Sequence, residues 1–397
     1  MKRTKGALMS NTKEIADTYL AKTYAHFPLE IVSGKGSLVY DEQGKEYIDL
    51  GSGIAVNAFG VADDAWIEAV TAQLGKVQHT SNLYYSEPCA LLAKQLCERT
   101  GMKRVFFGNS GAEANECGIK VARKYAQDKY GQERNIIVTL ENSFHGRTLT
   151  TLAATGQEHY HELFTPLTPG FVSVPANNLD AMRALVEQED GKVAGIMMEC
   201  VQGEGGVVAL TEEFMQGVAA LCAEKDIILV IDEVQTGNGR SGHLYAYEHF
   251  GIKPDVVTTA KGLGGGLPLG ACIIGEKAAN VLGAGDHGST FGGNPVCCAG
   301  ALSVLGRIDD ALLEEVKAKS TYVFETLQGA QGVENVSGLG LMIGIKPTKP
   351  AGEVVAACME AGVLCLTAKD RVRLLPALNI PMDLLKQSVE VIKNCCA

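Results

Sequence analysis

The chain has 397 residues, 46% of them hydrophobic, which is enough apolar sequence to bury the cores of about two domains. A formal net charge of −11 and a pI of about 5.3 argue against nucleic acid or an anionic membrane surface as its main partner. Because no apolar run is long enough to cross a bilayer, and no apolar segment follows the basic residues near Met1, we expect a cytoplasmic protein without membrane contact.

The N-terminal part of the chain predicts an arm, short strands and two helices. Residues 1–30 have the pattern of a helical arm. Runs of β-branched and aromatic residues bounded by Gly and Asp turns predict strands, and two periodic stretches predict helices. The strands are expected at Leu29–Val32, Ser37–Tyr40 and Tyr47–Leu50, and the helices at Asp63–Leu74 and Glu87–Arg99.

From about residue 104, near-continuous apolar runs alternate with helical patterns. This alternation is typical of a mostly parallel sheet with helices on both faces, and it places the chain in the α/β class. The expected strands are Arg104–Phe107, Asn135–Thr139, Gly170–Val174, Val193–Met198, Ile227–Ile231, Asp255–Thr259 and Ala271–Ile274.

After Pro295 the pattern changes to two long helices, ending near Ile308 and Leu327, and then to mixed short elements. This tail predicts a smaller α+β domain that packs with the N-terminal strands. We therefore expect residues 1–60 to form an arm and small-domain strands, 61–295 a large ligand-binding domain, and 296–397 the rest of the small domain.

The twelve cysteines are scattered, and they include no CxxC pair. Many fall within apolar helix or strand patterns. They predict buried thiols in a reducing compartment, with neither a disulfide framework nor a metal site.

Ligands of parallel sheets bind at the carboxyl ends of the strands, so the residues after each apolar run are the candidates for function. Lys261 follows one strand and precedes a glycine-rich loop, which lets a ligand approach closely. Partial burial lowers the pKa of a lysine, which then forms a Schiff base with a carbonyl compound. A surface lysine before a loop is the alternative for this stretch alone.

Two other strand ends offer groups that suit a flat, charged ring. An acid such as Asp232 at the end of a buried strand needs a partner, for instance a protonated ring nitrogen, and Gln235 is within reach of a ring hydroxyl. Phe144 is suited to stacking on a ring and Arg147 to holding a carboxylate. The alternatives are a structural hydrogen bond for Asp232, a core Phe144 and a surface Arg147.

A phosphate site is predicted after the strand at Arg104–Phe107. Ser110 is suited to cap a helix, so Gly111 and Ala112 would present free backbone N–H groups at its N-terminus. An ordinary capped helix is the alternative. Neither a Walker motif nor GxGxxG accompanies it, so a nucleotide is not favoured.

The remaining candidates lie in two other loops. Glu204 occurs in a second glycine loop, and Ser289 and Thr290 offer hydroxyl groups before a helix. A lysine, an acid, a stacking ring, a phosphate-binding helix end and an arginine together are what pyridoxal 5'-phosphate (PLP) requires of its protein.

These motifs carry a resemblance that covers the chain from about Tyr24 to Leu378. The sequence resembles the class III (ω-amino) aminotransferases of the fold-type I PLP enzymes, which implies a seven-stranded sheet and a homodimer with shared active sites. The motifs are Asp49–Asn57, Asn109–Glu116, Phe144–Thr148, Gln202–Gly206, Asp232–Gly237, Thr259–Gly262, Gly288–Pro295 and Val372–Pro376.

The resemblance implies roles around the cofactor ring. It implies that Lys261 forms the Schiff base with PLP and then moves protons between substrate and cofactor. Asp232 would keep the pyridine nitrogen protonated, Gln235 would lie near the ring hydroxyl, and Phe144 would stack on the ring.

It also implies roles for the phosphate and the substrate. Gly111 and Ala112 would bind the phosphate through backbone N–H groups, and Thr290 would reach it from the other subunit. Arg147 is similar to the arginine that binds the distal carboxylate of the substrate, and Ser289 to a neighbour of that substrate.

Glu204 and Arg373 are similar to a switch pair of the family. The two would pair while the ω-amino substrate is bound, and Glu204 would release Arg373 for the α-carboxylate of glutamate or 2-oxoglutarate. Ile54 favours N2-acetyl-L-ornithine as donor over free ornithine, because ornithine aminotransferases typically carry a tyrosine there. Ornithine, succinylornithine, succinyl-diaminopimelate and 4-aminobutyrate remain alternatives, as does a PLP-binding protein without catalysis.

Two departures from the family pattern occur, at Val61–Asp64, where a His-x-His-Pro run is common, and at Asn238, where an apolar residue is common. Neither is expected to touch the chemical core. Both are expected to affect the pocket edge or the dimer contact.

Overall fold

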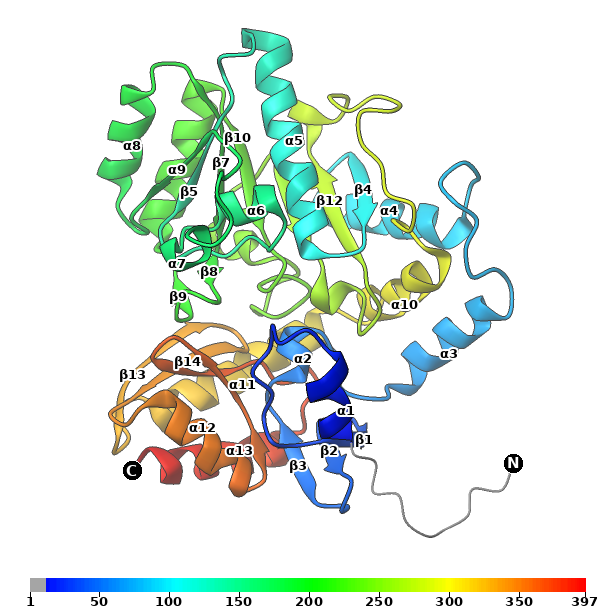
Figure 1. The fold of residues 1–397 in the computed structure, drawn as a ribbon, viewed down its shortest axis with the longest axis vertical. Helices are drawn as coiled ribbons and strands as arrows, with labels where there is room; N and C mark the ends of the chain where they lie inside the picture. Colours follow the sequence, from blue (N-terminus) through cyan, green and yellow to red (C-terminus); the bar gives the residue numbers. More distant parts are fainter. Residues whose placement is uncertain (1–11) are drawn as a thin grey trace.

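A computed structural model describes residues 12–397. Its upper half in Figure 1 is a seven-stranded sheet with helices on both faces. The strand order is β4 (Arg104–Gly108), β12 (Gly270–Ile274), β11 (Val256–Thr259), β10 (Ile228–Asp232), β7 (Val193–Glu199), β5 (Ile136–Leu140) and β6 (Phe171–Val174).

The sheet is mostly parallel, as the sequence predicts. Strand β12 alone in it runs antiparallel to its neighbours β4 and β11. The other pairs are parallel, so β4, β11, β10, β7 and β5 end at the same edge. That edge is where the residues following each strand meet.

Both faces of this sheet are buried under other elements. Successive side chains of a strand point to opposite faces, so they enter two different apolar clusters. On β10, Val230 joins an apolar cluster with residues of α5, whereas Leu229 and Ile231 join the larger core on the other side. The helices of this half are α5 (Gly111–Tyr130), α6 (Leu149–Ala154), α7 (Glu158–His161), α8 (Leu179–Gln188) and α9 (Glu212–Lys225), with 3₁₀ turns at Ala246–Phe250, Lys261–Leu263 and Glu276–Ala278.

The lower half brings the two ends of the described chain together, blue beside orange and red in Figure 1. One sheet has the order β1 (Ile31–Lys35), β2 (Leu38–Asp41), β3 (Glu46–Asp49) and β15 (Val363–Leu364), and so pairs N-terminal with C-terminal strands. A second has the order β13 (Val333–Leu339), β14 (Met342–Pro347), β17 (Arg371–Leu374) and β16 (Leu366–Ala368). The domain boundaries given above stay a prediction.

The remaining elements link or cover these sheets. A short hairpin, β8 (Val201–Gln202) with β9 (Val208–Ala209), projects from the upper half. The other helices are α1 (Thr12–Tyr19), α2 (Ser52–Ala55), α3 (Asp64–Leu74), α4 (Glu87–Thr100), α10 (Pro295–Leu305), α11 (Asp310–Leu327), α12 (Ala351–Glu360) and α13 (Met382–Cys396).

The N-terminal arm is less helical than predicted. Of the described part of the arm, only Thr12–Tyr19 forms a helix, and residues 1–11 lie outside the described residues. No side chain of α1 is buried, so no packing extends the helix, and Pro28 restricts the backbone before the first strand. That strand accordingly begins at Ile31 instead of Leu29.

Candidate active site

A pocket of about 490 Å³ lies at the sheet edge where the parallel strands end. Residues from after β4, β5, β10 and β11 line it, together with the end of β7 and the first turn of α5. Seven of the predicted site residues are among its walls: Gly111, Ala112, Phe144, Arg147, Asp232, Gln235 and Lys261.

Lys261 follows β11 and has a left-handed backbone conformation, with φ of 44°. Such a φ is uncommon outside glycine and costs free energy, so the surrounding packing must hold it. Burial of the amino group lowers the pKa of Lys261 to about 8, although the nearby Glu204 carboxylate acts in the opposite direction. At neutral pH this lysine therefore has an appreciable uncharged, nucleophilic fraction.

We expect the apoprotein to capture PLP faster as pH rises through about 8, and then to level off, because only the neutral amine attacks an aldehyde. At pH 7 a pKa of about 8 gives roughly 230-fold more neutral amine than the pKa of about 10.4 of a free lysine. Stopped-flow absorbance of apoprotein mixed with PLP at a series of pH values measures this. A rate that still rises in proportion to hydroxide near pH 10 would contradict it.

Asp232 ends β10 and is held from three sides. Its Oδ2 accepts hydrogen bonds from Asn115 Nδ2 at 2.7 Å and, with the tautomer so assigned, from His145 Nδ1 at 2.8 Å. Its Oδ1 accepts one from the backbone N–H of Val234 at 3.0 Å. Asn115 is itself fixed by the hydroxyl of Thr258, which donates to its Oδ1 at 2.5 Å. The carboxylate is therefore oriented toward the pocket by groups on α5, β11 and two loops.

Sequence reasoning missed Asn115, His145 and Glu199, which line the pocket behind the predicted residues. Burial opposes the charge on His145, but its hydrogen bond to Asp232 raises the pKa of the imidazole overall. Burial raises the pKa of Glu199 to about 7, while its bonds from Phe144 N and Gly203 N act in the opposite direction. The signal for Asn115 was its position one turn after Gly111 on α5.

The first turn of α5 forms the predicted cradle. Ser110 caps the helix by accepting from Glu113 N at 3.2 Å, so the N–H groups of Gly111 and Ala112 have no intrahelical partner. A Cβ on Gly111 would lie 2.6 Å from Val234 Cγ1, so glycine is required where this turn meets the pocket wall. Free N–H groups at a helix N-terminus suit an anion.

Phe144 and Arg147 occupy the loop after β5. The guanidinium of Arg147 lies 4.2 Å from the ring centre of Tyr160 and 5.7 Å from that of Phe144. Arg147 is exposed as a whole while it lines the pocket, so its charge is available to a substrate carboxylate.

Glu204 and Arg373 form an ion pair, with Arg373 Nη1 donating to Glu204 Oε1 at 2.5 Å. Glu204 lies in the turn between β8 and β9, and Arg373 on β17. Burial raises the pKa of Glu204, but the charge and hydrogen bond of Arg373 outweigh it and lower the pKa overall. The same guanidinium reaches Gln235 Oε1 at 3.3 Å, and among residues 12–397 its buried Nε has no hydrogen-bond partner.

Five predicted residues do not line this pocket in the single chain: the paired Glu204 and Arg373, and also Thr290, Ser289 and Ile54. Thr290 is exposed, and Ser289 lies beside it, accepting from Asn109 Nδ2 at 3.1 Å. Ile54 is 41% exposed and lines a neighbouring apolar pocket of about 300 Å³. It belongs to a left-handed turn in which all residues of Ser52–Ala55 have positive φ.

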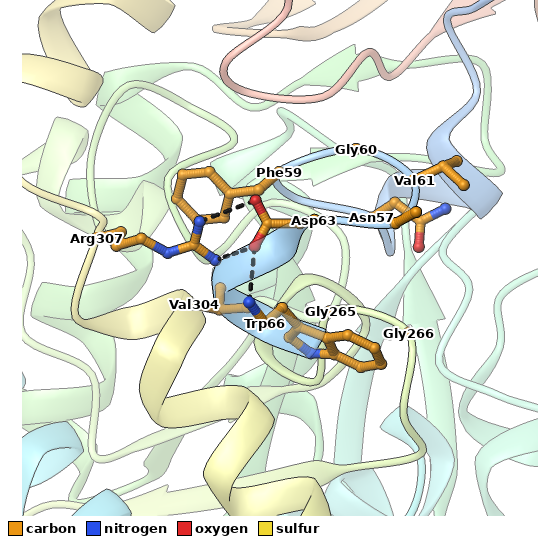
Figure 2. A pocket seen from close by; sticks show the side chains of 11 residues that line it. Asn57, Phe59, Gly60, Val61, Asp63, Trp66, Gly265, Gly266, Val304 and Arg307 are labelled. Carbon is orange, nitrogen blue, oxygen red and sulfur yellow. Dashed lines mark hydrogen bonds and ion pairs between the residues drawn. The ribbon is translucent and has the colours of Figure 1, made fainter. Parts of the chain in front are cut away.

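The departure at Val61–Asp64 lies in a second, smaller pocket of about 130 Å³, shown in Figure 2. Asp63 accepts from Arg307 at 2.8 and 3.0 Å and caps α3 by accepting from Trp66 N. Trp66 in turn donates to Gly264 O at 3.1 Å, which fixes the glycine loop after Lys261. Asp63 therefore supports the back of that loop through Trp66.

Of the glycines in this loop, Gly265 is the one that packs tightly against Trp66. Gly265 has φ of 60°, and a Cβ there would lie 2.9 Å from Trp66 Nε1 and from Val304 Cγ2 (Figure 2). We expect Gly265→Ala to lower the free energy of unfolding by about 1–3 kcal/mol, through strain and overpacking. Urea unfolding followed by Trp fluorescence measures this, with Gly283→Ala as the control, since a Cβ there would make only an ordinary contact with Asp286 Oδ2 at 3.6 Å.

Asn238 does not line the lysine pocket, but it lies against the residues that precede Lys261. Its backbone is left-handed, with φ of 57°, which asparagine tolerates. Its side-chain amide is buried and donates to Thr259 Oγ1 at 2.9 Å and to Ala260 O at 3.3 Å. It therefore supports the two residues that precede Lys261.

Other site types find no counterpart in the described chain. Among residues 12–397, no group of three or more His, Cys, Asp or Glu side chains is arranged to hold a metal. In the same residues, no helix is both long and apolar enough for a bilayer. All twelve cysteines are free thiols, and most are buried, as predicted.

The family of the chain is established by comparison with known proteins. The family model described as "Aminotransferase class-III" matches residues 19–396. The chain therefore belongs to the class III aminotransferases, and it is a PLP-dependent transaminase.

The relatives to which the chain is similar include transaminases of ornithine and its acylated forms. The chain is 51% identical to an acetylornithine aminotransferase of Haemophilus ducreyi, over 96% of this chain and 97% of that protein. It is 44% identical to a succinylornithine transaminase of Salmonella paratyphi A, over 94% and 93%. Among solved structures, an ornithine aminotransferase of Toxoplasma gondii with partial PLP occupancy matches with a TM-score of 0.92 and 28% identity, covering 98% of this chain and 94% of that one.

The pocket residues fit PLP on three counts. Its walls include an amine of lowered pKa at Lys261, a buried and oriented carboxylate at Asp232, and a helix N-terminus whose cradle a Cβ at Gly111 would fill. These are the groups that an aldehyde, a pyridine nitrogen and a phosphate need. When bound, PLP supplies an aldehyde for the substrate amine and a ring that accepts electrons.

Proposed function

We propose that this transaminase transfers the δ-amino group of N2-acetyl-L-ornithine to 2-oxoglutarate, giving N-acetyl-L-glutamate 5-semialdehyde and L-glutamate, a step of arginine biosynthesis in the cytoplasm. The observation that carries the proposal is the Arg373–Glu204 ion pair of 2.5 Å beside the pocket of Lys261. It suits a site that accepts two unlike substrates in alternation. The named relatives support the acetylated donor.

In this proposal the chain moves and holds protons around the cofactor. With PLP bound, Lys261 Nζ would act as the base that takes the proton from the substrate carbon bearing the amine and would serve as the acid in the return transfer. Asp232, oriented by Asn115 and His145, keeps the pyridine nitrogen protonated. Phe144 and Gln235, which line the same pocket, would hold the ring by stacking and by contact with its hydroxyl.

The two ends of the bound molecules have separate partners. Gly111 and Ala112 donate backbone N–H groups to the phosphate. Arg147 holds the α-carboxylate of acetylornithine, which is distal to the reacting amine, with Ser289 beside it. Glu204 covers Arg373 while that substrate is bound and releases it when the α-carboxylate of 2-oxoglutarate or glutamate enters.

Ile54 supports an acetylated donor, because its apolar side chain offers no hydrogen bond to a free α-amino group. Succinylornithine is the second candidate, since the chain is also similar to a succinylornithine transaminase. The test is kcat/KM for acetylornithine, succinylornithine, ornithine and 4-aminobutyrate, with 2-oxoglutarate as acceptor. Acetylornithine is expected to give the highest value; equal or better use of free ornithine would overturn the substrate assignment.

We further propose a homodimer in which Thr290 completes the phosphate site of the partner. Thr290 is exposed in its own chain, and Leu83, Tyr84 and Phe291 expose apolar side chains around it, as a dimer surface does. Mixed dimers of Lys261→Ala and Thr290→Ala chains test this. Such a dimer contains one intact site, so activity should return on mixing; no recovery would contradict shared sites.

A further inference from the structure

Arg371 carries a buried donor that the resting structure leaves unpaired. Within residues 12–397, its Nη1 atom is shielded from solvent and makes no hydrogen bond. Leaving such a donor unpaired costs free energy, and more when the group is charged. An unpaired buried guanidinium needs an explanation, and one explanation is an acceptor that reaches it in another conformation of the protein.

The side chain of Arg371 reaches the hairpin turn that holds Glu204. Arg371 and Arg373 are two residues apart on β17, so their side chains share one face of the sheet. On the neighbouring strand, a Cβ on Gly344 would lie 3.2 Å from Arg371 Cδ and 2.7 Å from Val207 Cβ. A Cβ on Gly206 would lie 4.0 Å from Arg371 Nε. The guanidinium therefore lies against the β8–β9 turn, two residues from Glu204.

We propose that Arg371 receives the Glu204 carboxylate when Glu204 leaves Arg373, so that the switch has two cationic positions. This rests on the proposed function, in which Arg373 must be free to bind the α-carboxylate of 2-oxoglutarate. A carboxylate displaced within a partly buried site needs a new partner. Adjacent same-face positions on a strand lie about 7 Å apart, which a glutamate in a glycine-rich turn spans by rotation and local backbone movement.

The charges around Arg371 are consistent with this second position. Lys346, on the neighbouring strand, is already paired with Glu334 at 3.1 Å and with Asp370 at 3.7 Å. Lys369 donates instead to Asn142 Oδ1. Glu204 is the acid of the turn that Arg371 touches, and its present partner is Arg373. Arg371 thus determines how easily Arg373 becomes available, and hence the affinity for the five-carbon dicarboxylate.

The test compares dicarboxylate binding with the donor half-reaction in Arg371→Met holoenzyme. The binding probe is glutarate, which lacks the keto group and does not react, measured by calorimetry. Its Kd is expected to rise about tenfold, the loss of roughly one charge-assisted hydrogen bond. The half-reaction with acetylornithine should change less than about twofold, since Glu204 and Arg373 stay paired in it. Arg371→Lys should restore part of the glutarate affinity.

Two further variants separate this role from a structural one. In a Glu204→Gln background Arg373 is free already, so Arg371→Met should no longer change the glutarate Kd. Lys346→Met removes the same charge from the neighbouring strand and should leave the Kd unchanged. An unchanged Kd in Arg371→Met, or equal losses with and without Glu204, would overturn the proposal.

The Arg373→Ala variant distinguishes a failure of the proposed Glu204–Arg373 switch from a failure of the role proposed for Arg371. If Arg373→Ala leaves the glutarate Kd unchanged, the proposed function of the switch is wrong. If Arg373→Ala weakens glutarate but Arg371→Met does not, the switch stands and Arg371 is not its second position.

Discussion

Replacing Lys261 by alanine is expected to lower turnover by more than about four orders of magnitude, because one group provides both the covalent link to PLP and the proton transfer. The fold should persist, since alanine fills less space and the left-handed backbone at this position, with φ of 44°, is held by its surroundings. The loss should appear in kcat. Steady-state turnover of PLP-loaded protein with both substrates at saturating concentration measures it.

The control for this variant is Lys94→Ala, which removes an exposed lysine on α4 that pairs with Glu98 at 3.2 Å. It should retain full activity and nearly the same melting temperature. If Lys261→Ala keeps steady-state turnover while Lys94→Ala behaves as expected, the assignment of Lys261 is wrong.

The second large effect is expected for Arg373→Ala, and it should be unequal between the two half-reactions. The half-reaction with 2-oxoglutarate should slow by about a hundredfold, because the α-carboxylate loses charge-assisted hydrogen bonds of about 1.5–3 kcal/mol. The acetylornithine half-reaction should slow less, since Arg147 holds that substrate by its distal end. Rates of each half-reaction, measured by single-turnover absorbance, give the comparison.

Glu204→Gln is the matched variant for this experiment. It removes the competing carboxylate but keeps Arg373. The expected result is tighter binding of 2-oxoglutarate and poorer discrimination against it during the donor half-reaction. Equal losses of both half-reactions in Arg373→Ala would argue against an alternating pair.

The sequence predicts those polar residues of the pocket that directly follow a strand. Asp232 and Lys261 directly follow apolar runs, and parallel strands end at one edge, so their proximity follows from the pattern. Gly111 and Ala112 are likewise fixed by the cap at Ser110. Such predictions need only local signals and one rule of topology.

The network behind Asp232 does not follow from those signals. His145 and Asn115 lie on a loop and on α5, and their hydrogen bonds to one carboxylate oxygen depend on side-chain placement across elements. The left-handed turn at Ser52–Ala55 is also invisible to propensity, because its β-branched Ile54 disfavours positive φ. Backbone strain of this kind is set by tertiary contacts.

Arg373 was recognised by resemblance alone, since nothing on a short strand marks one arginine as a ligand. The glycines after Lys261 differ from Arg373, because they do carry a local sequence signal. Their pattern correctly predicted a tight loop, but Gly264 and Gly265 are required by the fit around Leu267 and Trp66. The glycine-rich composition therefore predicted where the loop lies, but not which neighbouring residues require glycine there.

The most direct test of the account is to mix the purified, PLP-loaded protein with glutamate alone. The visible absorption of the bound cofactor should disappear as 2-oxoglutarate forms, one molecule per chain, and should return when acetylornithine's product, N-acetylglutamate 5-semialdehyde, is added. A visible band that ignores glutamate, with no 2-oxoglutarate released, would contradict the assignment of this site as a transaminase.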